Sequence, residues 1–364
     1  MTTASTSNGA IDLTDKSGAG KIRRVCVIGG AGYVGSVLIE RLLDEGYAVT
    51  VLDALMYGDD GVRHVIERPG FDLVQGDLRN IEAVVAACRF ADAVVHLGAL
   101  VGDPACELDE QLTLQINRDA TFTAAAIARG LGIERFIFAS TCSVYGASDD
   151  LLDEQSALEP ISLYARSKME SEQLLLSMVG NGFCPSVLRF GTFYGHSPRE
   201  RFDLVVNLLT AKAVTEREIT IMGGQQWRPF LHVADGAESI MRVLKAPAAA
   251  VSHQVFNVGS DEQNQRLADI AGLIAEQVPD VRVRFAEAAA VEANYRVSFA
   301  HIDSTLGFRP SRSIRDGIAE IRSAVESGLV DDYKDAKYSN FKAMTTGDAA
   351  HALDGQQDVK AAVG

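Results

Sequence analysis

A glycine-rich turn between an apolar strand and a helix constrains the fold of this chain more than any other feature. The turn has the spacing G-x-x-G-x-x-G, and its candidate binding residues are Gly29, Gly32, Tyr33, Val34 and Gly35. An apolar run precedes it, and apolar residues at helical spacing follow it. Glycines allow the tight turn and let backbone N–H groups reach a pyrophosphate at the N-terminus of a helix. The turn therefore predicts a dinucleotide site at the end of the first strand.

Apolar strands and helices alternate along the first half of the chain. Strands are predicted at 24–29, 48–52, 71–74, 93–97, 136–140 and 186–190, and helices at about 81–89, 117–130 and 164–179. This alternation indicates an α/β fold of the Rossmann type, a doubly wound parallel sheet with helices on both faces.

The pattern changes after about residue 190, where the predicted segments become shorter and less regular. We expect a dinucleotide-binding domain over 21–190 and a smaller α/β substrate domain over 191–340, with some segments returning to the first. Residues 1–20 are rich in Ser, Thr, Gly and Asp, and residues 341–364 lack a steady hydrophobic period. We expect a flexible leader and a flexible tail there.

The composition of the chain limits its class and its partners. Asp plus Glu outnumber Lys plus Arg by 49 to 34, so a polyanion such as nucleic acid would meet a repulsive field. Hydrophobic residues make up 47%, which excludes disorder throughout. The sequence shows no signal peptide and no run of about 20 apolar residues that would cross a membrane. Five scattered cysteines without metal spacing favour reduced thiols, a cytoplasmic location and no metal site.

Residues at the ends of the next strands extend the predicted cofactor site. Asp53 ends the second strand, where a carboxylate accepts hydrogen bonds from both hydroxyls of an adenosine ribose. The same carboxylate would repel a 2′-phosphate, so NAD is favoured over NADP. Asp77 and Leu78 follow the third strand and are placed to hold an adenine edge. Leu97 and Ala99 follow the fourth strand among small residues that let a cofactor lie close.

A phenol and an ammonium, Tyr164 and Lys168, stand four residues apart on a predicted helix. This spacing puts them on one helix face, where the ammonium would lower the pKa of the phenol from about 10 toward neutrality. Such a phenol works as a general acid or base. Hydroxyl side chains in the segment 138–146 follow the fifth strand, at the edge of the sheet where ligands bind. We expect a hydroxyl there to share a substrate oxygen with Tyr164.

Together these motifs resemble the extended short-chain dehydrogenase/reductase superfamily, and within it the nucleotide-sugar epimerase/dehydratase family of the UDP-glucose 4-epimerase kind. The resemblance runs from about 22 to 335. It includes L-R-F-G-T-F-Y-G at 188–195, R-P-F-L-H-V-A-D at 228–235 and L-G-F-R-P at 306–310. It implies bound NAD and a nucleotide diphosphate sugar as the substrate.

The resemblance also implies roles for single residues. Thr141 takes the catalytic Ser/Thr position, Tyr164 is the acid/base, and Lys168 anchors the nicotinamide ribose. Asn117 stands where the family often has an Asn of the same core, although a helix-start cap is an equal interpretation. The family pairs two long helices, here 117–130 and 164–179, in a four-helix dimer interface, so we expect a homodimer.

The expected contacts to the sugar nucleotide are less specific. Arg228 is the first candidate for the diphosphate, from its place in the motif R-x-x-x-H-V-x-D, and Arg199 and Arg201 are the next. Thr192 stands where the family usually has an Asn. The full expected set is Thr141, Cys142, Ser143, Thr192, Arg201, Asn207, Arg228 and Arg296.

The residues after Thr141 bear on the type of reaction. Family dehydratases that remove water across C5–C6 usually carry Asp-Glu there, whereas this chain has Cys142 and Ser143, which disfavours 4,6-dehydration. The remaining interpretation is an epimerase that oxidises a sugar hydroxyl, expected at C4, to a ketone and returns hydride to the other face. A 4-ketoreductase or dehydratase of the same family stays open as an alternative. A non-catalytic NAD-binding sensor or scaffold is a further one.

Overall fold

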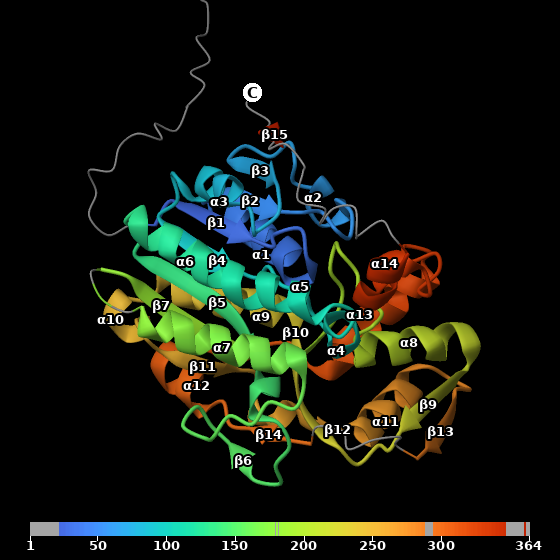
Figure 1. Cartoon of the computed structure of the whole chain (residues 1–364). Helices are drawn as coiled ribbons and strands as arrows, with labels where there is room; N and C mark the ends of the chain where they lie inside the picture. Colours follow the sequence, from blue (N-terminus) through green and yellow to red (C-terminus); the bar gives the residue numbers. More distant parts are fainter. Residues whose placement is uncertain (1–21, 179, 181, 288–293, 347–359, 362–364) are drawn as a thin grey trace, which may run out of the picture.

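A computed structural model describes residues 22–178, 180, 182–287, 294–346 and 360–361. The predicted leader over 1–20 lies outside the described residues, as do 347–359 and 362–364 of the predicted tail. Figure 1 shows a large central sheet with helices around it, and a group of shorter strands and helices beside it.

Seven parallel strands form the central sheet, which confirms the predicted doubly wound α/β class. They run in the order β11-β7-β5-β4-β1-β2-β3, and β15 pairs antiparallel with β3 at the edge. The strands are β1 (Arg24–Ile28), β2 (Ala48–Asp53), β3 (Phe71–Gln75), β4 (Ala93–His96), β5 (Arg135–Thr141), β7 (Cys184–Phe190), β11 (Val255–Val258) and β15 (Lys360–Ala361). The order reverses between β1 and β4, and the carboxyl ends of strands at such a switch point border a ligand-binding crevice.

Helices cover both faces of this sheet, which is why its central strands are continuous apolar runs. One face packs against α3 (Ile81–Cys88), α6 (Ala120–Gly130) and α7 (Leu163–Ser177), and the other against α1 (Tyr33–Asp44) and α9 (Val233–Lys245). In Figure 1, α6 and α7 lie side by side across the front of the sheet. Every residue of β1 is buried, as its position at the centre of the sheet requires.

The second region consists of three small sheets and their helices. Its strands are β6 (Leu151–Leu152), β8 (Thr192–Tyr194), β9 (Glu218–Met222), β10 (Trp227–His232), β12 (Asn264–Arg266), β13 (Arg282–Ala286) and β14 (Arg296–Val297). Helices α8 (Val205–Glu216), α11 (Leu267–Gln277) and α13 (Ile314–Glu326) pack around them on a separate apolar core. Two segments after residue 190 return to the large sheet, because β11 pairs with β7 and α9 packs on α1.

Short helical elements connect these layers. The α-helical ones are α2 (Asp60–Arg63), α4 (Asp103–Cys106), α5 (Glu110–Leu114), α10 (Ala248–Val251), α12 (Ala300–Leu306) and α14 (Asn340–Thr345). A π-helical turn, η1 (Gln115–Asp119), leads into α6, and 3-10 turns occur at η2 (Cys142–Tyr145), η3 (Asp261–Gln263) and η4 (Ala336–Tyr338). The longest described α-helix is α7 with 15 residues. Within the described ranges no helix is both long and apolar enough to cross a membrane.

The start of the predicted flexible tail is wrong. Residues 340–345 form helix α14, which packs against α4, and the backbone at 360–361 forms strand β15. Figure 1 shows α14 beside the large sheet, next to α4 and α13. The prediction failed because the helix is short and is held by contacts to distant segments, which no local hydrophobic period reveals.

Candidate active site

The turn after β1 is shaped so closely around glycine that other residues would collide with backbone. Gly29 has φ +80°, and a Cβ on it would lie 2.5 Å from the backbone nitrogen of Gly98, at the end of β4. A Cβ on Gly35 would lie 2.5 Å from the carbonyl oxygen of Gly29. The turn therefore holds β1, β4 and the start of α1 in close approach, as a backbone cradle for a pyrophosphate requires.

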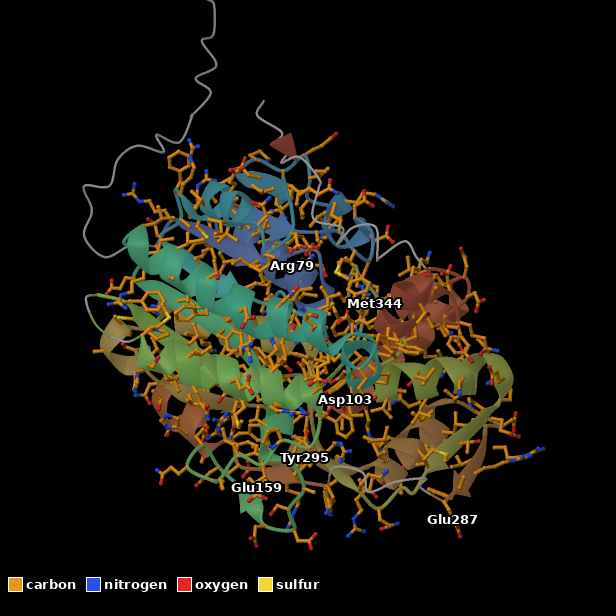
Figure 2. All side chains as sticks on the ribbon, in the orientation of Figure 1. Arg79, Asp103, Glu159, Glu287, Tyr295 and Met344 are labelled. Atoms are coloured by element: carbon orange, nitrogen blue, oxygen red, sulfur yellow. The ribbon has the colours of Figure 1, made fainter. Side chains whose placement is uncertain are left out.

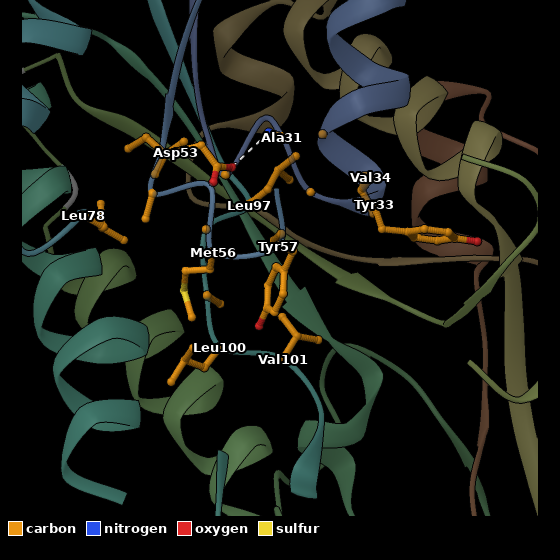
Figure 3. Close-up of a pocket in the computed structure, with 18 of the residues that line it drawn as sticks. Ala31, Tyr33, Val34, Asp53, Met56, Tyr57, Leu78, Leu97, Leu100 and Val101 are labelled. Carbon is orange, nitrogen blue, oxygen red and sulfur yellow. Dashed lines mark hydrogen bonds between the residues drawn. The ribbon is translucent and has the colours of Figure 1, made fainter. Parts of the chain in front are cut away.

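One cleft runs from this turn along the carboxyl ends of the strands (Figure 3). Every residue that the sequence predicted for the cofactor lines it: Gly29, Gly32, Tyr33, Val34, Gly35, Asp53, Asp77, Leu78, Leu97, Ala99, Tyr164 and Lys168. Residues the sequence did not suggest line it as well: Met56, Tyr57, Leu100, Val101, Phe193 and Asn340. The predicted set therefore forms one continuous surface, although its members are spread over 140 residues of chain.

Asp53 is fixed at the end of β2 by backbone hydrogen bonds. Its Oδ2 accepts from the N–H of Ala31 at 2.9 Å and its Oδ1 from the N–H of Leu55 at 2.8 Å, and Figure 3 marks the first of these. Burial raises the pKa of this carboxyl, whereas the two backbone N–H groups act against that rise. Each oxygen keeps a lone pair that can accept from a ribose hydroxyl. Asp77 is held differently, in an ion pair with Arg79 at 2.6 Å.

Tyr164 and Lys168 lie on one face of α7 and both border the cleft. The Nζ of Lys168 donates to the carbonyl oxygen of Ala139 at 2.9 Å, and burial lowers the pKa of this lysine to about 8. Burial raises the pKa of Tyr164 well above its usual value, which is opposite to the expected lowering. The prediction considered only the neighbouring ammonium, whereas desolvation of the phenolate is the larger effect in the protein alone.

A buried charged network lies beneath these two residues. Glu172, one turn after Lys168, pairs with Arg189 at 2.7 Å, and both side chains are almost fully buried. The hydroxyl of Ser140 donates to the same carboxylate, and Arg189 also donates to the hydroxyl of Tyr145 at 2.9 Å. The network joins α7 to β5 and β7, so it fixes the helix that carries Tyr164.

The catalytic hydroxyl predicted at Thr141 lies at the end of β5. Its Oγ1 accepts a hydrogen bond from the N–H of Ser143 at 3.1 Å and caps the 3-10 turn, while Ser140 borders the cofactor cleft. A capping hydroxyl uses its oxygen as an acceptor and keeps its proton for donation. The role of Thr141 toward the substrate stays a prediction.

Asn117 is not a helix cap, because it lies inside the π-helical turn η1. Its Oδ1 accepts from the N–H of Leu100 at 2.8 Å, and its Nδ2 donates to the carbonyl of Leu100 and to the hydroxyl of Ser167. The side chain therefore ties the loop after β4 to α7, which agrees with the core role that the resemblance implied. Single π-turns of this kind are frequent near functional sites.

A second group of side chains, called the second wall below, lies outside the residues that line the cofactor cleft. The hydroxyls of Ser143 and Tyr295 are 3.3 Å apart, and the guanidinium of Arg228 lies 5.4 Å from the centre of the Tyr295 ring. Tyr295 is one of the groups that raise the pKa of Tyr164, so the two phenols interact. Figure 2 shows Tyr295 below Asp103, on the side of the molecule where β6 and β14 pair. The sequence prediction assigned the substrate contact of this segment to the neighbouring Arg296.

Three residues predicted for the substrate are placed elsewhere. Asn207 is fully buried, and its amide is used by the backbone of Gly195 and by the carbonyl of Arg201, so it supports a loop rather than a phosphate. The thiol of Cys142 is buried and donates to the carbonyl of Arg189. Arg201 forms an ion pair with Asp203 at 2.9 Å and borders the cofactor cleft.

Two other predicted contacts, Arg296 and Thr192, are not among the residues that line the cofactor cleft. Arg296 donates to the carbonyl of Asp149 at 2.9 Å and lies beside the ring of Trp227, outside the cofactor cleft. Thr192 lies in β8 opposite Phe230. Their roles toward the substrate stay predictions. Across the described ranges no group of three or more His, Cys, Asp or Glu side chains has the geometry of a metal site.

Comparison with known proteins agrees with this geometry. The pattern of the NAD dependent epimerase/dehydratase family matches residues 25–259. An uncharacterized UDP-glucose epimerase of Bacillus subtilis, YtcB, is 26% identical over 81% of this chain and 95% of its own length. A dTDP-glucose 4,6-dehydratase of Actinoplanes is 28% identical over 82% of this chain and 96% of its own length. The solved structure of MoeE5 in complex with UDP-glucose and NAD is 26% identical, with a TM-score of 0.73 over 84% of this chain and 99% of that one.

Proposed function

Because the chain belongs to the NAD-dependent epimerase/dehydratase family, we propose that it is an NAD-dependent nucleotide-sugar epimerase that inverts a sugar hydroxyl, at C4, through a ketone. One observation carries the choice of reaction. Tyr164 and Lys168 border the cofactor cleft, while Cys142 and Ser143 supply no carboxylate for the removal of water.

The cleft fits NAD on its own geometry. The turn at 29–35 leaves no room for side chains between the backbones, so its N–H groups can approach a pyrophosphate. Asp53, held by two backbone N–H groups, is oriented to accept from the adenosine ribose. Lys168, which borders the cleft, would hold the nicotinamide ribose. When bound, NAD supplies the hydride acceptor and donor for the sugar carbon.

The protein residues then move the proton. Tyr164 takes the proton from the sugar hydroxyl and later returns it, which requires its phenolate to form at neutral pH. Its pKa in the protein alone is raised by burial, so the positive charge of Lys168 and of the oxidised cofactor would have to favour the phenolate. The hydroxyl of Thr141 can donate to the same sugar oxygen. Ser143 and Tyr295 would then lie against the sugar, and Arg228 against the diphosphate.

The proposal is tested by incubating the purified protein with UDP-, dTDP- and GDP-hexoses. We expect one of them to be converted to its 4-epimer without change of mass and without net formation of NADH. Loss of water by mass spectrometry would favour a dehydratase, and stoichiometric release of oxidised or reduced cofactor would favour a ketoreductase. Binding of NAD without turnover of any nucleotide sugar would favour a sensor or scaffold.

We also propose a homodimer formed through α6 and α7. Phe122 on α6 is 43% exposed, and Ile161, just before α7, is 59% exposed, so α6 and the segment that leads into α7 present apolar surface outside the core. Light scattering on the purified protein tests this, and a monomer mass at micromolar concentration would contradict it.

A further inference from the structure

One buried cation borders the cofactor cleft without a carboxylate partner. Arg199 is only 4% exposed, and within the described residues no carboxylate lies within ion-pair distance of it. Its Nη2 donates to the Oδ1 of Asn340 at 2.8 Å, and its Nε has no hydrogen-bond partner among the described groups. A buried guanidinium is costly unless an anion compensates its charge. Such a residue at the wall of a cleft therefore indicates that the ligand carries the anion.

The ring of Tyr57 packs against the guanidinium of Arg199. The guanidinium of Arg199 lies 4.4 Å from the centre of the Tyr57 ring, and the hydroxyl of Tyr57 is a second buried group without a partner in the described part of the chain. Figure 3 shows the Tyr57 ring standing in the cleft beside Val101. Two unpartnered donors next to each other in one cleft match a ligand with several acceptor oxygens.

The C-terminal helix holds this pair in place. Asn340 begins α14 and is 4% exposed; besides accepting from Arg199, its Nδ2 donates to the carbonyl of Val101 and its N–H donates to Asp203. Met344 of the same helix packs on the apolar cluster to which Tyr164 contributes. Figure 2 shows Met344 on α14, close to the short helix that begins at Asp103. These residues lie beyond the span of the family pattern, which ends at 259.

We propose that Arg199 binds the diphosphate of the dinucleotide cofactor, with the hydroxyl of Tyr57 as a second donor and Asn340 as the residue that positions the guanidinium. The diphosphate would then be bound from two sides. Backbone N–H groups of the turn at 29–35 would donate from one side, and Arg199 and Tyr57, held by Asn340 and together called the clasp, would donate from the other. Arg199 and Tyr57 line the same cleft as the glycine turn and Asp53, whereas Arg228 is not among its lining residues. This shared cleft favours the cofactor over the sugar nucleotide, which carries the same diphosphate chemistry. The inference rests on the proposed use of NAD.

The experiment compares Arg199→Gln with Arg228→Gln in the full-length protein. NAD binding and binding of UDP, dTDP and GDP are measured by calorimetry, together with the NAD retained after gel filtration. We expect Arg199→Gln to weaken NAD binding roughly 10- to 100-fold, the range of a lost hydrogen bond from a charged group, and to leave nucleoside diphosphate binding unchanged. Arg228→Gln should show the reverse. Weakened diphosphate binding with unchanged NAD binding in Arg199→Gln would overturn the assignment.

Two milder variants keep the test decisive if Arg199→Gln fails to fold. Tyr57→Phe removes a hydroxyl that has no partner in the described protein, so we expect unchanged thermal stability and NAD binding weakened by several-fold. Asn340→Ala should weaken NAD binding while leaving the turn at 29–35 intact.

Binding of ADP and adenosine separates the phosphate contact from the contact to the base, because the variants should lose affinity for ADP only. Equal NAD affinity in both variants and wild type would refute the clasp, whereas a wild type that binds no NAD would refute the proposed function itself.

Discussion

The two walls of the candidate site differ in whether backbone or side chains form them. The cofactor wall is largely backbone, and a Cβ added at Gly29 or Gly35 would collide with other backbone atoms at 2.5 Å. The second wall, which the proposed function assigns to the substrate and which is called the substrate wall below, is made of the side chains of Ser143, Arg228 and Tyr295 from three distant segments. A backbone wall fixes one ligand and tolerates little change, whereas a side-chain wall changes its ligand by single substitutions. Under the proposed function, the choice of substrate therefore depends on the side chains of the second wall.

The largest expected effect is at the boundary of the two walls. Tyr164→Phe removes the proposed acid/base and should lower kcat by roughly 10²- to 10⁴-fold while NAD stays bound. The measurement is turnover of the nucleotide sugar that the wild type converts. Tyr47→Phe, a change of the same size at a half-buried position away from the cleft, is the control. Unchanged turnover in Tyr164→Phe would remove the proton-transfer role.

The substrate wall is tested by Arg228→Gln. Loss of a charged contact to the diphosphate should raise KM for the nucleotide sugar roughly 10- to 100-fold, with a smaller change in kcat and no loss of NAD. Arg282→Gln, an exposed arginine paired at the surface with Glu218, should leave KM unchanged. A fall in NAD content would show that the two walls are not independent.

The cofactor wall is tested by Gly35→Ala. The added methyl would lie 2.5 Å from the carbonyl of Gly29, so the backbone must shift, at a cost of about 1–3 kcal/mol in the free energy of unfolding, and NAD should be lost. Gly272→Ala is the matched control, because Gly272 lies in α11 and a Cβ added there would meet no atom within 4 Å outside the helix's own backbone. There alanine should stabilise the helix by about 0.5–1 kcal/mol. Denaturant unfolding of the two variants decides the comparison.

The smallest effect expected is a pH dependence of the cofactor wall. Burial lowers the pKa of Lys168 to about 8, so in the protein without ligands its ammonium is lost as the pH rises through 8. NAD affinity should fall several-fold between pH 7 and 9.5, whereas in Lys168→Arg, which stays charged, it should be nearly flat. The contribution of Lys168 to the free energy of unfolding changes in the opposite direction to the NAD affinity. Between pH 8 and about 10.5 this lysine binds a proton in the unfolded chain but not in the folded one, so the folded protein becomes more stable as the pH rises there. Parallel affinity profiles of wild type and variant would exclude Lys168 as the titrating group.

The residues predicted for the cofactor line one cleft, whereas most of those predicted for the substrate do not, and the difference has a physical reason. The carboxyl ends of successive parallel strands lie next to one another, so Gly29, Asp53 and Asp77 could be placed together from their positions after strands alone. The substrate wall depends on loops whose positions no strand order determines. Asn207 had the right residue type for a phosphate contact, yet its amide supports a loop. Asn340 carried no signal at all, because its three partners are 137 to 239 residues away in sequence.

The placement of Asn340 also determines when the site can form during synthesis. The strands and turn that cradle the cofactor lie in the first half of the chain and can begin to fold as they leave the ribosome. One border of the same cleft belongs to a helix near the end of the 364-residue chain. In the nascent protein this border of the cleft is therefore open until residues 340–345 have been made and α14 has packed against α4. Tight binding of the cofactor then follows the docking of that helix rather than the folding of the strands.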